Sequence, residues 1–217
     1  MAHPVDGQSR VGELPAPSFS RRAMLKAGGW LAAAAALLGA GGVQARAASR
    51  VALDLNKEQD RRRVRGQWRV ASGLVPGEPN EGLVAGIAGT PARLPEYDDS
   101  EWEVWDNIRQ GRSSGFTFAW YRIKVELPEE ADGVSLAGAQ VFFETNVDNH
   151  GEIWVDGELP AGGEIVGRNA QQRVLVSQRA VPGARHVIAC LAINAPLAAP
   201  RGGVFLRYAT LAFETPG

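Results

Sequence analysis

The sequence has few of the residues that build metal and redox centres. Its 217 residues include one cysteine, Cys190, three histidines and two methionines. A single cysteine forms no intramolecular disulfide and no cysteine-based zinc cluster. An excess of positive charge is lacking too, because 23 Lys and Arg stand against 24 Asp and Glu. The apolar stretch over residues 27–43 is shorter than the roughly 20 residues of a membrane-spanning helix.

The remaining composition is that of a folded protein. Apolar residues make up 45% of the chain and charged residues 22%, with 26 glycines and 13 prolines. These values exclude a collagen-like chain, a coiled coil and a wholly disordered chain. The length fits one domain, or one domain with a tail. No repeat at a fixed period is present, which argues against a propeller or a solenoid.

The N-terminal region has the pattern of an export signal. Arg21 and Arg22 are followed by Ala-Met-Leu-Lys, which resembles the twin-arginine export motif. The stretch 27–43 comes next, and Ala45-Arg46-Ala47 has the small-x-small pattern of a cleavage site after Ala47. We therefore expect a twin-arginine translocase as the partner during export, and a periplasmic or extracellular protein with no stable membrane anchor. The alternative is an uncleaved anchor.

These patterns divide the chain into three parts. Residues 1–47 are expected to be a signal peptide with a disordered n-region, 48–65 a polar linker or short helix, and 66–217 one β-sandwich domain. Cleavage would remove five basic and two acidic residues and leave a net charge of −4. Such a domain is a poor partner for nucleic acid. The arginine run 61–63 is therefore interpreted as a solvated face.

Period-two patterns dominate the second half of the chain. Between residues 121 and 127, apolar side chains alternate with Arg122, Lys124 and Glu126, which predicts a strand with one buried and one exposed face. Asp156-Gly157 after an apolar run predicts a two-residue turn, and Trp154 is expected in the core. The predicted strands are residues 120–127, 141–147, 152–155, 173–177, 185–193 and 203–213.

Helical signals are weak. Residues 55–64 are polar and helix-permissive, and residues 129–132 are expected to make a single turn. Many short strands without interleaved helices predict an all-β fold, namely an antiparallel β-sandwich.

Four segments together resemble a known family. They are residues 97–102 (YDDSEW), 120–122 (WYR), 146–159 (NVDNHGEIWVDGEL) and 193–213. Their order resembles the sugar-binding jelly-roll domain of family 2 glycoside hydrolases, which has the galactose-binding-like fold, and the last segment is similar to an accessory domain of secreted gluconolactonase-type proteins. The resemblance covers residues 66–214. It implies a non-catalytic sandwich, because the catalytic acids of the hydrolases lie in a separate barrel.

Catalytic and metal-binding patterns are sparse. No serine lies in a G-x-S-x-G elbow, and neither His150 nor His186 has a second histidine at ligand spacing. Cys190 alternates with Ile188 inside an apolar run and is interpreted as a small core residue. We expect no cofactor and no metal. Several strand carboxylates, such as Glu144 and Glu152, leave open a small carboxylate-dependent hydrolase.

Sugar binding is the function that these observations favour. Sugars are held by aromatic faces and by planar polar side chains, although Asn and Asp in loops also bond to their own backbone in turns. The expected partner is a carbohydrate or, if the domain is an accessory module, a separately encoded lactonase or hydrolase. The candidate ligand-binding residues are Trp105, Asp148, Asn149, His150, Arg168, Asn169 and Asn194.

Overall fold

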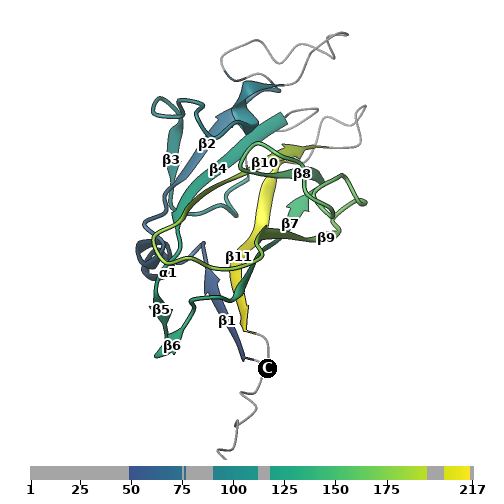
Figure 1. Ribbon diagram of the computed structural model, residues 1–217. Helices are drawn as coiled ribbons and strands as arrows, with labels where there is room; N and C mark the ends of the chain where they lie inside the picture. The colour runs from purple at the N-terminus through teal and green to yellow at the C-terminus, as the bar shows by residue number, and fades with distance from the viewer. Residues whose placement is uncertain (1–48, 75, 77–89, 112–117, 195–202, 216–217) are drawn as a thin grey trace, which may run out of the picture. The chain divides into compact units, whose positions relative to one another are not determined.

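The protein is described from a computed structural model, which covers residues 49–74, 76, 90–111, 118–194 and 203–215 (Figure 1). The signal-peptide prediction, including Arg21 and Arg22, lies outside the described residues and stays a prediction. Within the described residues, no helix is both long enough and apolar enough to cross a membrane. Strands make up nearly all of the regular secondary structure of the described residues, so the predicted all-β class is confirmed.

Two antiparallel sheets form the sandwich. Sheet A contains, in spatial order, β1 (Ser49–Asp54), β11 (Phe205–Thr215), β7 (Gln140–Asp148) and β9 (Gln171–Ser177). Sheet B contains β3 (Glu103–Trp105), β2 (Trp68–Ser72), β4 (Phe118–Glu126), β10 (Arg185–Ile193) and β8 (His150–Val155). The smaller elements are α1 (Glu58–Arg63), a 3₁₀ turn η1 (Pro91–Arg93), and the ribbon of β5 (Glu130–Ala131) and β6 (Val134–Ser135).

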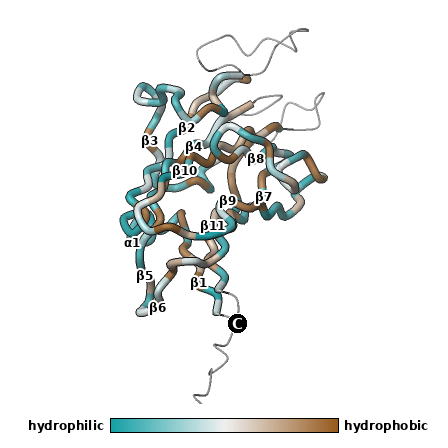
Figure 2. The backbone as a smooth tube through the Cα atoms, viewed as in Figure 1, coloured by the Kyte–Doolittle hydropathy of each residue, from teal (hydrophilic) through white to brown (hydrophobic). Residues whose placement is uncertain are grey.

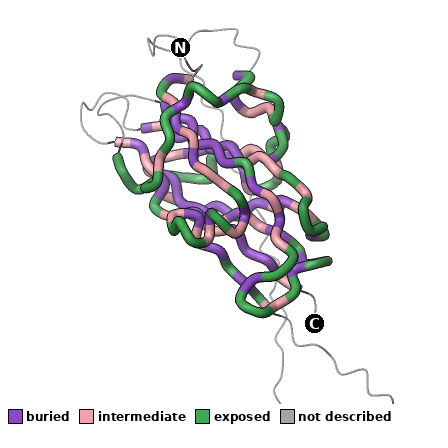
Figure 3. The backbone as a smooth tube through the Cα atoms, turned by 90° about the vertical axis from the view of Figure 1, so that its left-hand side faces the viewer, coloured by how far each residue is buried: buried purple, intermediate pink, exposed green. Residues whose placement is uncertain are grey.

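The main core lies between the two sheets. Alternate residues of each strand point inward, such as Leu53 and Phe143 from sheet A and Ile188 and Cys190 from sheet B. Figure 2 shows the hydrophobic residues gathered on the strands, and Figure 3 shows the buried positions there. Interdigitation of inner faces is the usual way in which stacked sheets form one core. Cys190 is fully buried among apolar neighbours, which confirms its interpretation as a core residue.

The outer face of sheet B is covered as well, which the sequence pattern did not predict. Arg122 on β4 is fully buried, although its position in the alternation predicted exposure. Its Nη1 donates to the carbonyl oxygens of Ala92 (2.6 Å) and Leu94 (3.0 Å), and its Nε donates to Asp99 Oδ2 (2.9 Å). The prediction of an exposed face is wrong at this residue, because the segment from η1 to β3 packs over the sheet.

The N-terminal boundary of the sandwich also differs from the expectation. Residues 49–54 are not part of a linker, because they form β1, which pairs with β11 over its whole length. The short helix α1 lies within the helix-permissive segment that follows. Its first arginine, Arg61, is 3% exposed and donates to the Leu55 and Asp106 carbonyl oxygens, so it does not belong to a solvated face.

Two further local predictions are corrected. Residues 129–132 do not make a helical turn, because β5 and β6 form a small antiparallel ribbon around Asp132-Gly133, both at positive φ. Trp154 lies on the outer face of sheet B and is only partly buried, with the Arg93 guanidinium 5.3 Å from its ring centroid. Its neighbours Ile153 and Val155 take the inward positions, and alternation therefore places Trp154 outside.

The two-residue turn after β8 is confirmed. Asp156 and Gly157 have φ of 50° and 85°, and Val155 and Glu158 exchange two backbone hydrogen bonds of 2.9 and 3.0 Å. This is the geometry in which Asp-Gly is favoured, because both central residues need positive φ. The turn fixes the position of the Asp156 carboxylate.

Candidate functional site

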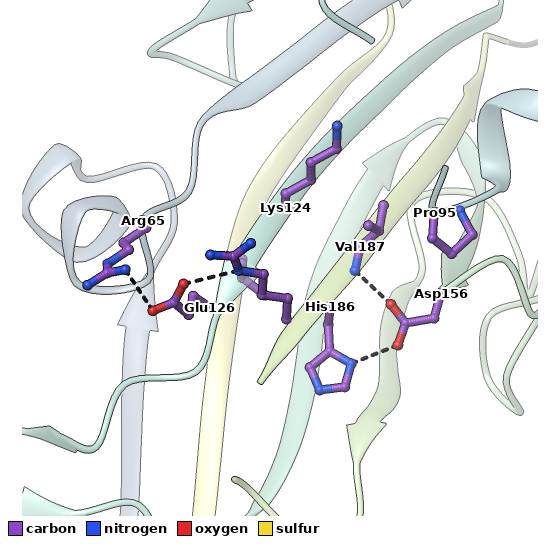
Figure 4. A pocket seen from close by; sticks show the side chains of 9 residues that line it. Arg65, Pro95, Lys124, Glu126, Asp156, His186 and Val187 are labelled. Atoms are coloured by element: carbon purple, nitrogen blue, oxygen red, sulfur yellow. Dashed lines mark hydrogen bonds and ion pairs between the residues drawn. The ribbon is translucent and has the colours of Figure 1, made fainter. Parts of the chain in front are cut away.

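A surface hollow of about 420 Å³ lies at one end of sheet B (Figure 4). The end of β4, the beginning of β10 and the turn after β8 supply most of its wall, and two flanking segments complete it. Its volume is within the range of small-molecule sites. The lining residues are Arg65, Pro95, Lys124, Val125, Glu126, Asp156, Arg185, His186 and Val187.

The Asp156 carboxylate is held from two sides. Its Oδ1 accepts the backbone N–H of Val187 at 2.7 Å, and its Oδ2 lies 2.7 Å from Nδ1 of His186. Because an ionised carboxylate only accepts hydrogen bonds, this contact places the imidazole proton on Nδ1 and leaves Nε2 of His186 for another partner. These contacts fix the orientation of both the Asp156 carboxylate and the His186 imidazole ring.

A second carboxylate, Glu126, lies between two arginines. Its Oε1 is 2.9 Å from Nη1 of Arg65, and its Oε2 is 3.2 Å from Nε of Arg185. Both carboxylate oxygens therefore have a cationic partner, and Figure 4 shows the contact between Arg65 and Glu126.

Local backbone structure brings Arg65 to this place. Arg65 follows the end of α1 with φ of 51°, and its N–H donates to the carbonyl oxygen of Arg62 (3.2 Å). A left-handed residue just past a helix is a common C-terminal cap. The carbonyl oxygen of Val64 accepts the N–H of Glu126 at 2.8 Å, which ties this cap to the end of β4. The cap and the strand end thus place Arg65 beside Glu126.

Lys124 is a further charged group of the hollow. Its Nζ is 2.8 Å from Asp99 Oδ1, while the other oxygen of Asp99 binds the buried Arg122. Burial by itself would raise the pKa of the Asp99 carboxyl, but the hydrogen bonds and charges of Lys124 and Arg122 outweigh burial and hold the pKa below its ordinary value. Asp99 is therefore a fixed anion shared by two cations.

The hollow combines charged, polar and apolar groups. Carboxylate, guanidinium and imidazole groups offer planar donors and acceptors, and Pro95, Val125 and Val187 offer apolar surface. None of the described residues that line it is Ser, Thr or Cys. Across the described part of the chain, no group of three or more His, Cys, Asp and Glu could hold a metal ion.

Most of the predicted ligand residues lie at the opposite end of sheet B. In the β4–β10 pairing, Glu126 faces Arg185 beside the hollow, and Phe118 faces Ile193 at the other end. His150 is the register partner of Ile193, which places the β7–β8 turn at that far end.

Two predicted residues, Asn149 and Asn169, are joined there by a backbone contact, and a third, Asp148, makes an ion pair. The N–H of Asn169 donates to the Asn149 carbonyl oxygen (2.6 Å), and Asp148 Oδ1 lies 3.2 Å from Nη2 of Arg207. Asn149 and Asn194 are buried, whereas Arg168 is exposed. The first contact joins two loops through their backbone, and the second is an ion pair between side chains. A ligand role for the predicted residues stays a prediction.

Trp105 lies apart from the other predicted residues. It is on β3, with its ring 6.0 Å from that of Tyr121 in an edge-on arrangement and its Nε1 donating to Glu103 Oε2 at 3.0 Å. The side chain is partly buried against the main core, so the aromatic face has a packing role.

The residues of the hollow were missed by sequence reasoning. They come from five separate segments of the chain. Four of these segments contribute charged side chains, which in the sequence look like ordinary solvated residues. One usable signal was present, because Asp156-Gly157 predicts a turn that ends β8 and exposes a carboxylate at a fixed place.

Comparisons with known proteins place the fold. No protein-family model matches the sequence, and no curated protein matches it. A β-glucuronidase from Bacteroides uniformis matches the structure with a TM-score of 0.50 and 16% identity over 76% of this chain and 18% of that chain. A Bacteroides uniformis β-glucuronidase 2, covalently bound to cyclophellitol-6-carboxylate aziridine, matches with a TM-score of 0.50 and 15% identity. The match again covers 76% of this chain and 18% of that chain. The shared feature is the β-sandwich fold.

The comparison confirms the fold that the sequence resemblance implied. The structure shares its β-sandwich fold with part of these β-glucuronidases. The chain spans less than one fifth of the length of these β-glucuronidases. At this level of identity the likeness concerns the fold, and function has to be argued from the site.

Proposed function

We propose that the chain is a carbohydrate-binding module that works outside the cytoplasm, with the hollow of Figure 4 as its binding site. The fold supports the proposal, because it is that of a β-sandwich domain of glycosidases. The observation that carries it is the pair of carboxylates, Asp156 and Glu126, each fixed by two protein donors beside an apolar wall.

The arrangement suits a sugar for physical reasons. Sugar hydroxyls bind best to acceptors and donors that are already oriented, because less side-chain entropy is then lost on binding. Asp156 and Glu126 are oriented by their existing partners and keep unused lone pairs, since a carboxylate accepts up to about four hydrogen bonds. Pro95 and Val187 can take the C–H surface of the ring.

The proposed role is binding without catalysis. Glycoside hydrolysis needs one carboxyl group as acid and a second as base or nucleophile. Here Glu126 is engaged by two arginines and Asp156 by His186 and a backbone N–H. In this arrangement both carboxylates are held in place by protein donors, which fits ligand recognition better than proton transfer.

A docking role is the second candidate, supported by one observation. Leu159, Ile165 and Val166, all in the connection between β8 and β9, are exposed apolar side chains. Neighbouring exposed apolar groups are typical of interaction surfaces. On this alternative the chain would be an accessory domain for a separately encoded lactonase or glycoside hydrolase.

A glycan array followed by calorimetry tests the proposal. The purified chain should bind at least one glycan, and Asp156→Asn should weaken binding about tenfold or more, because a hydrogen bond to a charged group contributes about 1.5–3 kcal/mol. Asparagine also accepts the positive φ of this position. Glu58→Gln, an exposed acid on α1, is the matched control and should leave affinity unchanged. Binding to no glycan would contradict the proposal.

A further inference from the structure

We infer that the hollow selects an acidic sugar, with the guanidinium groups of Arg65 and Arg185 binding the carboxylate of a uronate-containing oligosaccharide. This inference rests on the proposed carbohydrate-binding function and adds a class of ligand to it.

The first argument is that the positive charges of the hollow lie nearer the surface than two of the negative charges paired with them. The cationic side chains reach the surface, with exposed fractions of 73% for Arg65, 81% for Arg185 and 55% for Lys124. The carboxylates that neutralise them are recessed, with exposed fractions of 19% for Glu126 and 8% for Asp99. A ligand that approaches the hollow therefore meets positive charge first, which raises the local concentration of anions.

The second argument is a count of charges. Glu126 is shared by Arg65 and Arg185, and Asp99 is shared by Arg122 and Lys124. Each of these two carboxylates balances only one of its two cations. The negative charge of Asp156, which is paired with His186, offsets part of the remainder. With His186 neutral, the cluster still has one positive charge more than negative charges.

The third argument is the set of unused donors. Arg65 reaches Glu126 through Nη1, and Arg185 reaches it through Nε. A guanidinium has five N–H donors in a planar fork, so most donors of both side chains remain for a ligand. The fork matches two oxygens of a carboxylate with parallel hydrogen bonds, which a lysine cannot do. The arginines are thus suited to a planar ligand anion.

The rest of the hollow fits the neutral part of such a ligand. Asp156 and His186 lie on the side of the hollow away from Arg65, and Pro95 lies near Asp156 (Figure 4). A sugar ring whose carboxylate bound the solvent-facing N–H groups of the two arginines, on the side away from Glu126, would have acceptors for its hydroxyl groups and an apolar contact at its other end. Charge and shape therefore favour the same orientation of the ligand.

Calorimetry with three glycans of equal length tests this inference. The glycans are a trigalacturonate, a neutral galactose trisaccharide and a sulfated trisaccharide. The trigalacturonate should bind at least tenfold tighter than the neutral sugar at about 50 mM salt, and its advantage should shrink at about 500 mM, because salt screens exposed charges. The sulfated sugar should bind more weakly than the trigalacturonate, because it lacks the planar carboxylate.

Variants of the arginines identify the groups responsible. Arg65→Gln and Arg185→Gln should each weaken trigalacturonate binding by fivefold or more and change neutral-sugar binding by less than twofold. Arg62→Gln, an exposed arginine on α1 outside the hollow, is the matched control and should change neither. Circular dichroism melts within about two degrees of the parent show that the variants are folded.

The outcomes separate the two proposals. Equal binding of acidic and neutral sugars, or unchanged trigalacturonate binding in both arginine variants, overturns the acidic-sugar inference and leaves the carbohydrate-binding function standing. Tightest binding of the sulfated sugar also overturns it. Failure to bind any of the three glycans or any glycan on the array overturns both.

Discussion

Replacing Arg122 tests the most unusual feature of the fold, a buried arginine on the outer face of sheet B. In Arg122→Met the Asp99 carboxylate loses one of its two cationic partners, and the carbonyl oxygens of Ala92 and Leu94 lose their donor. Removing one partner of a buried ion pair costs about 3–5 kcal/mol. Lys124 continues to bind Asp99, which places the expected loss of unfolding free energy near the lower end, about 3 kcal/mol.

Urea denaturation followed by tryptophan fluorescence measures this loss of unfolding free energy, and thermal denaturation measures the corresponding fall in melting temperature. For a domain of this size, each kcal/mol shifts the melting temperature by about 2–4 °C, so the expected fall is roughly 6–12 °C. Arg173→Met, which removes surface ion pairs on sheet A, is the control and should cost less than about 1 kcal/mol. If Arg122→Met also costs less than that, the buried arginine does not stabilise the fold as argued.

The same cluster predicts how stability depends on pH. The pKa of Asp99 is lower in the folded chain than its ordinary value, so the unfolded chain binds the proton more readily. The contribution of Asp99 is therefore complete above its ordinary pKa of about 3.9 and is lost as the pH falls through the lower, folded-state pKa. Asp99→Asn should flatten this acid dependence in urea titrations between about pH 5 and pH 2, and an unchanged slope would contradict the assignment.

Three further outcomes are expected. Gly163→Ala should destabilise the chain by about 1–3 kcal/mol, because the new Cβ would lie 2.4 Å from the Ile153 carbonyl oxygen, whereas Gly111→Ala meets no atom within 4 Å and should be nearly neutral in the same melts. Cys190 should resist alkylation in the folded chain, because burial raises the pKa of its thiol; rapid labelling in a native thiol assay would contradict its burial. Changing the twin arginines at 21–22 to lysines should leave the precursor in the cytoplasm on fractionation, and undiminished export would refute the export prediction.

Local patterns in the sequence predict several strands well. The run from Arg185 to Ile193 was predicted with the bounds that β10 has, because it is nearly continuous apolar sequence between turn residues. A central strand covered on both faces is buried along most of its length, so its composition identifies it without knowledge of its partners. The turn at Asp156-Gly157 was predictable for a similar reason, since its geometry depends on two residues alone.

Contacts between distant segments explain what was missed. The segment that forms β1 reads as polar linker, because its partner β11 lies about 160 residues away in the sequence. Arg122 reads as an exposed residue, because the segment that covers it is not adjacent in the sequence. The hollow depends on the register of β4 with β10 and on the helix cap at Arg65, and neither can be derived from local periodicity.

The pairing of β1 with β11 has a mechanical consequence. Ser49 and Thr215 are register partners, so the polypeptide enters and leaves the sandwich side by side. Tension applied through both ends would break the hydrogen bonds between β1 and β11 one after another. It would not load all of these hydrogen bonds at the same time. The same geometry allows a longer polypeptide to carry the domain as an insertion with little separation between the flanking segments.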